Sequence, residues 1–268
     1  MQRFGLTVFI LTLLARPMVA QRDTNNDGLV DVLVPIAVQT SESFVLGAYG
    51  SRWATETWVR TERATFDARF QRDYPCYQDP IRCTFAGQRS IRPQIGTAGE
   101  ADRGVLLSFH PATVKLLTLS SRVLELSRNA QPNGVDVPVV WEGNYLTDPT
   151  VLLAIPQTDE SRVALRIYDP RRRPEARFRV EFLSLEGSNQ VIAETVLTTQ
   201  RQQGTELYLP AYVTINDLGM TFPQLAGVER FDIRITPLEG PIEYWTFAAV
   251  THRETQHVLF IVPDREKP

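Results

Sequence analysis

The stretch RFRVEFLSLEG, residues 177–187, decides the fold class. Apolar and charged residues alternate in its first half: the apolar set is Phe178, Val180 and Phe182, and the charged set is Arg177, Arg179 and Glu181. A period of two places each set on one face of a β-strand, which is typical of an antiparallel sheet with one wet face. The alternation slips at Leu183 and Leu185, which fall on the charged face, and this predicts a β-bulge near Phe182 or Leu183.

Similar runs of β-branched and aromatic residues, punctuated by Gly, Pro, Asn or Asp, fill the chain on both sides of this strand. The rhythm stops at the polar stretch QTDES after residue 156 and then restarts. Two sets of about seven strands fit an all-β fold of two tandem antiparallel β-sandwiches of the immunoglobulin-like type. We expect the first domain over residues 29–156 and the second over 157–268, with a short link that restricts their relative motion. One continuous larger β-fold is the alternative.

The amino terminus has the pattern of a cleaved signal peptide over residues 1–20. Arg3 precedes an apolar run over residues 4–15, and small Ala20 precedes the expected cleavage point. No later stretch reaches the roughly 20 apolar residues that a membrane-spanning helix requires. We therefore expect an exported chain with no transmembrane segment after cleavage, located in the periplasm, on the cell surface or in the medium.

Directly after this segment, DTNNDGLVD, residues 23–31, has the ligand pattern of a calcium loop. The oxygen donors would come from Asp23, Asn25, Asp27, the Leu29 carbonyl and Asp31. An EF-hand is excluded because the twelfth position is Val34 and no helix flanks the loop. The pattern is closer to the strand-flanking loops of integrin-like propeller repeats. The alternative is a solvated polar tether over residues 21–28, and calcium is the one cofactor that the sequence suggests.

The chain has two cysteines, Cys76 and Cys83. An exported chain meets oxidising surroundings, so we predict that this pair closes a local disulfide. A redox-active or metal-binding pair is the alternative, but the spacing is not CxxC and no further ligands lie nearby.

The charge balance indicates neither nucleic acid nor an anionic membrane as a partner, because the net charge is −3 and both signs are interspersed. Of the 28 basic residues only Lys115 and Lys267 are lysine, which we interpret as the codon bias of a GC-rich, bacterial genome. The arginine-rich stretch DPRRRPEAR, residues 169–177, has prolines with turn chemistry, and we interpret it as a solvated hairpin tip. The alternative is an anion site.

No catalytic constellation is recognisable. The histidines are His110, His252 and His257, and the last two flank a turn without a third ligand or an obvious Asp partner. GxSxG, HExxH, P-loop and GxGxxG motifs are absent from the sequence. Carboxylates are plentiful but scattered, so no catalytic residue is assigned.

Aromatic residues have structural explanations. Trp53 and Trp58 lie five positions apart in one expected strand and should face opposite sides of a sheet. Trp245 and Phe247 share a face, which favours a core position over a carbohydrate platform. Trp141 ends a strand near a loop and is the aromatic residue that is hardest to assign.

Three segments together resemble a known group: GAYGSRWATETWVRT at 47–61, LTLSSRVLELSRNAQPNGVDVPVVWEGNY at 117–145 and YWTFAAVTHRETQHVLFIVP at 244–263. They are similar to exported bacterial β-sandwich proteins with a VPV…GA.GS.W.TELW opening, an R…LSR…G.E.PVV segment and a closing WAF.SVT…TQ hairpin. The resemblance covers most of the mature chain. It implies the fold and export, and it implies no activity.

The leading hypothesis is therefore a non-catalytic exported pair of β-sandwiches that binds an unknown protein or glycan ligand, as a binding, adhesion or envelope-structural module. One alternative is an exported hydrolase with carboxylates on a sandwich face. A second is a periplasmic chaperone that works by strand donation, which rests on fold analogy alone.

Overall fold

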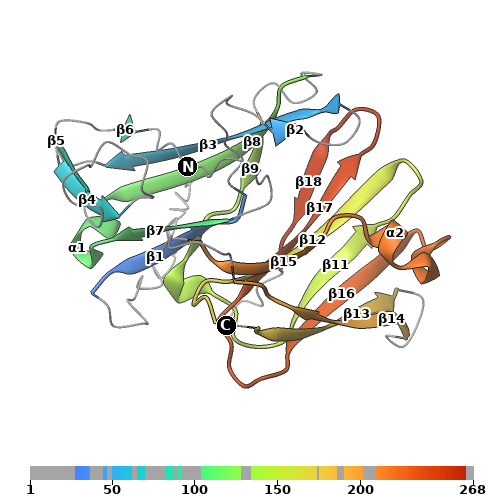
Figure 1. Cartoon of the computed structure of the whole chain (residues 1–268). Coiled ribbons are helices and arrows are strands. Elements are labelled where there is room, and N and C mark those ends of the chain that lie inside the picture. Colours follow the sequence, from blue (N-terminus) through green and yellow to red (C-terminus); the bar gives the residue numbers. More distant parts are fainter. Residues whose placement is uncertain are drawn as a thin grey trace, which may run out of the picture.

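In the computed structural model, the described part of the chain is all-β and forms four antiparallel sheets (Figure 1). The residues that it describes are 28–36, 45–46, 50–61, 65–69, 83–86, 90–91, 104–127, 134–173, 175–185, 190–201 and 209–263.

Two sheets are built from the first half of the chain, at the left of Figure 1. The β1 sheet has the order β10 (Val140–Trp141), β1 (Val30–Val34), β7 (Val105–Phe109), β4 (Thr65–Arg69) and β5 (Cys83–Ala86). The β3 sheet has the order β2 (Val45–Leu46), β3 (Arg52–Thr61), β8 (Leu117–Glu125) and β9 (Val135–Val137), and β6 (Ser90–Ile91) also pairs with β3. A short helix, α1 (Pro111–Val114), joins β7 to β8.

The other two sheets are built from the second half, at the right of Figure 1. The β13 sheet has the order β11 (Thr150–Pro156), β16 (Arg230–Pro237), β13 (Arg177–Ser184) and β14 (Val191–Thr198). The β12 sheet has the order β15 (Ala211–Ile215), β12 (Ser161–Asp169), β17 (Trp245–His252) and β18 (Val258–Ile261). The helical turns α2 (Leu218–Thr221) and η3 (Pro223–Leu225) join β15 to β16.

Among the described residues, three apolar clusters hold these sheets together. Phe178, Val180 and Phe182 of β13 belong to a core between the β13 and β12 sheets, and a second core lies between the β1 and β3 sheets. The third cluster joins the halves, because Leu33 of β1 packs in the same core as Trp245 of β17. The β12 sheet is consequently covered on both faces, and seven of the eight residues of β17 are buried. Burial on both faces ties the two halves into one packed body.

The strand that decided the fold class behaves largely as its sequence indicates. The alternation of buried and exposed residues in β13 is confirmed, and the ladder with β14 is irregular between Phe182 and Leu183, where the sequence predicts a bulge. Ile192 of β14 is the extra residue, because Phe182 pairs with Ala193 and Leu183 pairs with Val191. The pairing of β13 with β16 stays regular through this point. Leu183 therefore remains on the outer, charged face of the sheet, where it is nevertheless buried.

The aromatic assignments are confirmed where the structure describes them. Trp53 is half-buried and Trp58 is 40% exposed, consistent with their opposite faces. Trp245 and Phe247 are buried in the core that joins the halves. Trp141 is half-buried and packs against the core of the first half.

The chain changes from one half to the other before the expected boundary. β11 lies within the first domain expected from the sequence, yet it pairs with β16 of the second half. Residues 142–149, which we call the connector, therefore lie between the two pairs of sheets. The domain limits themselves stay predictions.

Candidate functional site

The connector is fixed to the second half by main-chain hydrogen bonds. It begins with the helical turn η2 (Glu142–Asn144). Leu146 then forms an antiparallel bridge with Tyr244, in which each main-chain N–H donates to the other residue's carbonyl at 2.8 and 2.9 Å. The Tyr244 hydroxyl also donates to the Asp148 carbonyl at 2.7 Å. These bonds hold Leu146 and Asp148 of the connector against Tyr244.

A cluster of charged groups around Arg171 fixes the start of the connector. The Arg171 Nη2 donates to Glu142 Oε1 at 2.6 Å, and its Nε donates to Glu243. The other Glu142 oxygen accepts from the main-chain N–H of Asp31 at 2.9 Å. The Asp31 carboxylate in turn accepts from Ser108 Oγ at 2.5 Å and lies 4.0 Å from Arg171. We call Asp31, Ser108, Glu142, Arg171 and Glu243 the Arg171 cluster.

Burial makes the charges of this cluster interdependent. The Glu142 side chain is fully buried and that of Arg171 is 14% exposed. Burial alone would lower the pKa of the Arg171 guanidinium, but hydrogen bonds to Glu243 and Glu142 outweigh it and hold the pKa above its ordinary value. Arg171 is thereby held in its charged form as the counterion of buried Glu142.

Tyr145 of the connector lies beside the Arg171 cluster. Its ring centroid is 5.8 Å from the guanidinium carbon of Arg171. The hydroxyl is buried and has no hydrogen-bond partner within the described part of the chain. Burial raises the pKa of this hydroxyl well above its ordinary value, and the carboxylates of Asp31 and Glu142 raise it further. The hydroxyl therefore stays protonated.

A tight turn directs Arg171 inward. Asp169, at the end of β12, accepts the main-chain N–H groups of Arg171 at 2.8 Å and Arg173 at 3.0 Å. Burial raises the pKa of the Asp169 carboxyl, while these N–H groups oppose that rise. The interpretation of residues 169–177 as a solvated tip is wrong for Arg171, whose side chain turns into the junction of the halves. A sequence signal exists, because Asp169 is in phase with the buried Ile167 and so continues an apolar face of β12.

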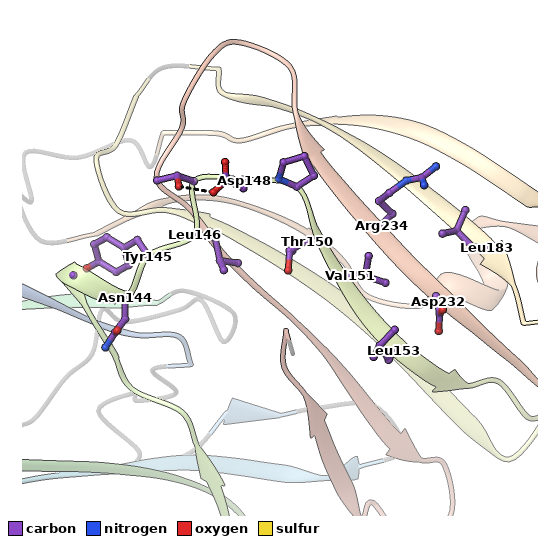
Figure 2. Close-up of a pocket in the computed structure, with 13 residues that line it drawn as sticks. Asn144, Tyr145, Leu146, Asp148, Thr150, Val151, Leu153, Leu183, Asp232 and Arg234 are labelled. Carbon is purple, nitrogen blue, oxygen red and sulfur yellow. Dashed lines mark hydrogen bonds between the residues drawn. The ribbon is translucent and has the colours of Figure 1, made fainter. Parts of the chain in front are cut away.

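A groove of about 800 Å³ lies along the connector. Figure 2 shows Asn144, Tyr145 and Leu146 on one side, β11 in the middle, and Arg234 and Leu183 on the other side. The apolar part of its lining includes Leu146, Val151, Leu153 and Leu183, and Leu153 is 48% exposed. Apolar surface flanked by a few fixed polar groups is the composition of ligand-binding pockets.

The charged groups of the groove are partly engaged. Arg234 donates through Nε and Nη2 to both oxygens of Glu181, each at 2.8 Å, and this pairing lowers the pKa of the Glu181 carboxyl. Asp232 accepts the main-chain N–H of Ala154 at 2.7 Å. Asp148 is exposed and accepts from Thr147 Oγ1 at 3.3 Å. Because Arg234 is matched by Glu181, Asp148 and Asp232 give this region an acidic balance.

The structure describes only the last part of the predicted calcium loop, residues 28–31. Asp23, Asn25 and Asp27 lie outside the described residues. Leu29 is buried, and the Asp31 carboxylate binds Ser108 and Arg171 as described above. Asp31 therefore has a structural role that is independent of an ion, and calcium binding stays a prediction.

The remaining candidate residues do not assemble a site. Cys83 begins β5, but Cys76 lies outside the described residues, so the disulfide stays a prediction. His110 accepts a main-chain N–H at the start of α1. Across their turn, the main-chain N–H of His252 donates to the His257 carbonyl at 2.9 Å. In the part of the chain that the structure describes, no group of three His, Cys, Asp or Glu residues could hold a metal ion.

Within the same residues, no helix combines the length and the apolar character needed to cross a membrane.

Comparisons with protein-family models, curated proteins and solved structures find no match. The resemblance to exported bacterial β-sandwich proteins accordingly stays a prediction, and the groove is the feature from which a function can be argued.

Proposed function

We propose that the chain is an exported, non-catalytic protein of two tandem immunoglobulin-like sandwiches that binds a protein or glycan ligand in the groove beside the connector. The observation that carries this proposal is the support of the groove. The Arg171 cluster and the Tyr244 bonds hold the connector wall, while paired strands supply β11 and the opposite wall. A preorganised wall lowers the entropy lost when a ligand binds.

The contacts of the charged residues favour binding over catalysis. Asp232 holds the Ala154 N–H, and Arg234 holds Glu181. A hydrolase needs one carboxyl group that is tuned to donate or accept a proton at the reacting bond. The groove residues instead offer an exposed carboxylate, Asp148, beside apolar side chains.

Two matched variants test the groove. Leu153→Arg places a positive charge in the groove, and Leu259→Arg places one on β18, which does not line it; these leucines are 48% and 52% exposed, so both variants should fold. The mature chain and both variants would be incubated with glycan and peptide arrays. We expect ligands that Leu259→Arg retains and Leu153→Arg loses. Equal binding by both variants would remove the groove from the proposal.

A second screen separates binding from hydrolysis. Chromogenic esters and glycosides would be offered to the mature chain, to Asp148→Asn and to Asp232→Asn. We expect no turnover above that of a denatured sample. Robust turnover that one of these substitutions abolishes would establish the hydrolase alternative in place of the binding module.

Export has its own test. Expression of the full chain with its first 20 residues should give a protein that is recovered outside the cytoplasm and whose amino-terminal sequence begins near Gln21. An unprocessed chain that remains in the cytoplasm would contradict the signal-peptide assignment.

A further inference from the structure

The register of the β13 sheet determines where the main-chain groups of β11 point. The Leu238 N–H donates to the Arg177 carbonyl at 3.0 Å, which makes Phe178 and Pro237 a non-hydrogen-bonded pair of the β13–β16 ladder. Hydrogen-bonded pairs alternate with such pairs, so Glu181 and Arg234 exchange main-chain bonds. The main-chain groups of Ile233 and Ile235, which lie on either side of Arg234, consequently face β11.

On β11, the partners of these two residues are Leu152 and Thr150. The N–H and C=O of Val151, between them, therefore point away from β16. The Gln157 N–H, which donates to the Glu229 carbonyl at 2.8 Å, gives the same alternation at the other end of the strand. Within the described residues no group hydrogen-bonds to the main chain of Val151 outside the ladder. Val151 lines the groove, so an open strand edge lies there.

This edge is open only over a short length. Pro149, before the strand, has no N–H to offer. After Leu152 a bulge sets two residues, Leu153 and Ala154, opposite Asp232, and the Ala154 N–H turns to the Asp232 carboxylate. Ala154 has a φ of 54°, a left-handed conformation that interrupts the pairing with β16 before it resumes at Ile155. Bulges and prolines protect sheet edges from unwanted pairing, so the groove coincides with the part of β11 that lacks such protection.

We propose that the groove takes an extended peptide segment of another protein, which adds a short strand to β11 at Val151 and is selected in part through a basic side chain. The inference rests on the groove being the binding surface. An extended peptide offers the alternating N–H and C=O groups that an open edge requires. The carboxylates of Asp148 and Asp232 supply the attraction for the basic side chain, since Arg234 is matched by Glu181.

The test compares two valines at opposite edges of one sheet. Val196 lies on β14, where the Thr199 N–H donates to the Ala176 carbonyl, so the main chain of Val196 also points away from its ladder. Proline is tolerated where a strand N–H makes no ladder bond. Val151→Pro and Val196→Pro therefore remove comparable N–H groups, and both should keep the unfolding midpoint of the parent chain within a few degrees.

The probes would be fluorescent, end-blocked pentapeptides of sequence Thr-Lys-Val-Lys-Thr, the same sequence with Glu in place of Lys, and the Lys peptide with alternate main-chain nitrogens methylated. Affinity for the mature chain would be measured by fluorescence anisotropy. We expect the Lys peptide to bind, the Glu and methylated peptides to bind about tenfold more weakly or less, and Val151→Pro to weaken the Lys peptide by about tenfold. Val196→Pro should leave its affinity unchanged.

The outcomes that overturn the inference are distinct from failure of the groove itself. Equal affinities of the Lys and methylated peptides, or of the two proline variants, would refute strand addition. The methylated probe needs no variant, so this result stands even where a proline variant unfolds. A glycan that Leu153→Arg loses and Val151→Pro retains, with no peptide bound, would keep the groove and refute the peptide. Ligands that are all insensitive to Leu153→Arg would refute both proposals.

Discussion

Replacing Arg171 by methionine should destabilise the protein far more than the loss of an ordinary surface arginine. The substitution keeps an apolar stem of similar length but leaves Glu142 buried, with its side chain fully inaccessible, beside Glu243 and Asp31. Breaking a buried pair by removing one partner costs about 3 to 5 kcal/mol. For a chain of this size that corresponds to a fall of roughly 6 to 20 °C in Tm.

The assay is urea-induced and thermal unfolding of the mature chain, followed by tryptophan fluorescence at pH 7. Arg234→Met is the matched control, because Arg234 is likewise hydrogen-bonded to a carboxylate, through Nε and Nη2 to Glu181, but is 35% exposed. Pairs with that much solvent access contribute about 0.2 to 1 kcal/mol. The double variant Arg171→Met/Glu142→Gln, which removes the stranded charge, should recover part of the loss.

The comparison of the two single variants decides the argument. A deficit at pH 7 no larger than that of Arg234→Met would refute the argument that Glu142 depends on Arg171.

Three further predictions concern single features. Tyr145→Phe removes a buried hydroxyl that has no partner among the described residues, so Tm should rise by roughly 2 to 4 °C; a fall would show that the hydroxyl is bonded in solution. Millimolar calcium should raise the unfolding midpoint relative to EDTA, and Asp23→Ala/Asp27→Ala should abolish that rise; coincident curves would leave the segment as a tether. Cys76 and Cys83 should resist alkylation in denaturant until a reductant is added, as read by mass spectrometry, and alkylation without reductant would contradict the disulfide.

Local patterns allowed much of the fold to be predicted. The alternation in β13 follows from neighbouring residues alone, and so does the place where it breaks. The burial of Leu183, which follows that break, could not be predicted from the sequence. Leu183 stays on the charged face and is 3% exposed there, opposite Asp232 of β16, its partner in the ladder. Its burial depends on segments that are distant in sequence.

The Arg171 cluster shows the same limit for charged residues. A run of arginines between prolines predicts a solvated turn, and the turn is present. The Asp169 turn directs Arg171 inward, but the carboxylates that it meets there, Glu142 and Glu243, lie 29 and 72 positions away, and no local pattern encodes such partners. The role of the connector could not be predicted from the sequence either, because this loop becomes the wall of a groove only after β11 pairs with β16.

The core that the two halves share also determines when the chain can finish folding. The Tyr168 hydroxyl donates to the Pro35 carbonyl 133 positions earlier, and the Asp31 N–H reaches Glu142 across 111 positions. Contacts between such remote partners form slowly, since the entropy of closing long loops opposes them. A growing chain that lacks β17 cannot complete this core, so the first half should remain only partly packed until synthesis is nearly over. For a protein that we propose to be exported, that delay would keep the polypeptide incompletely folded, and so able to be translocated across the membrane.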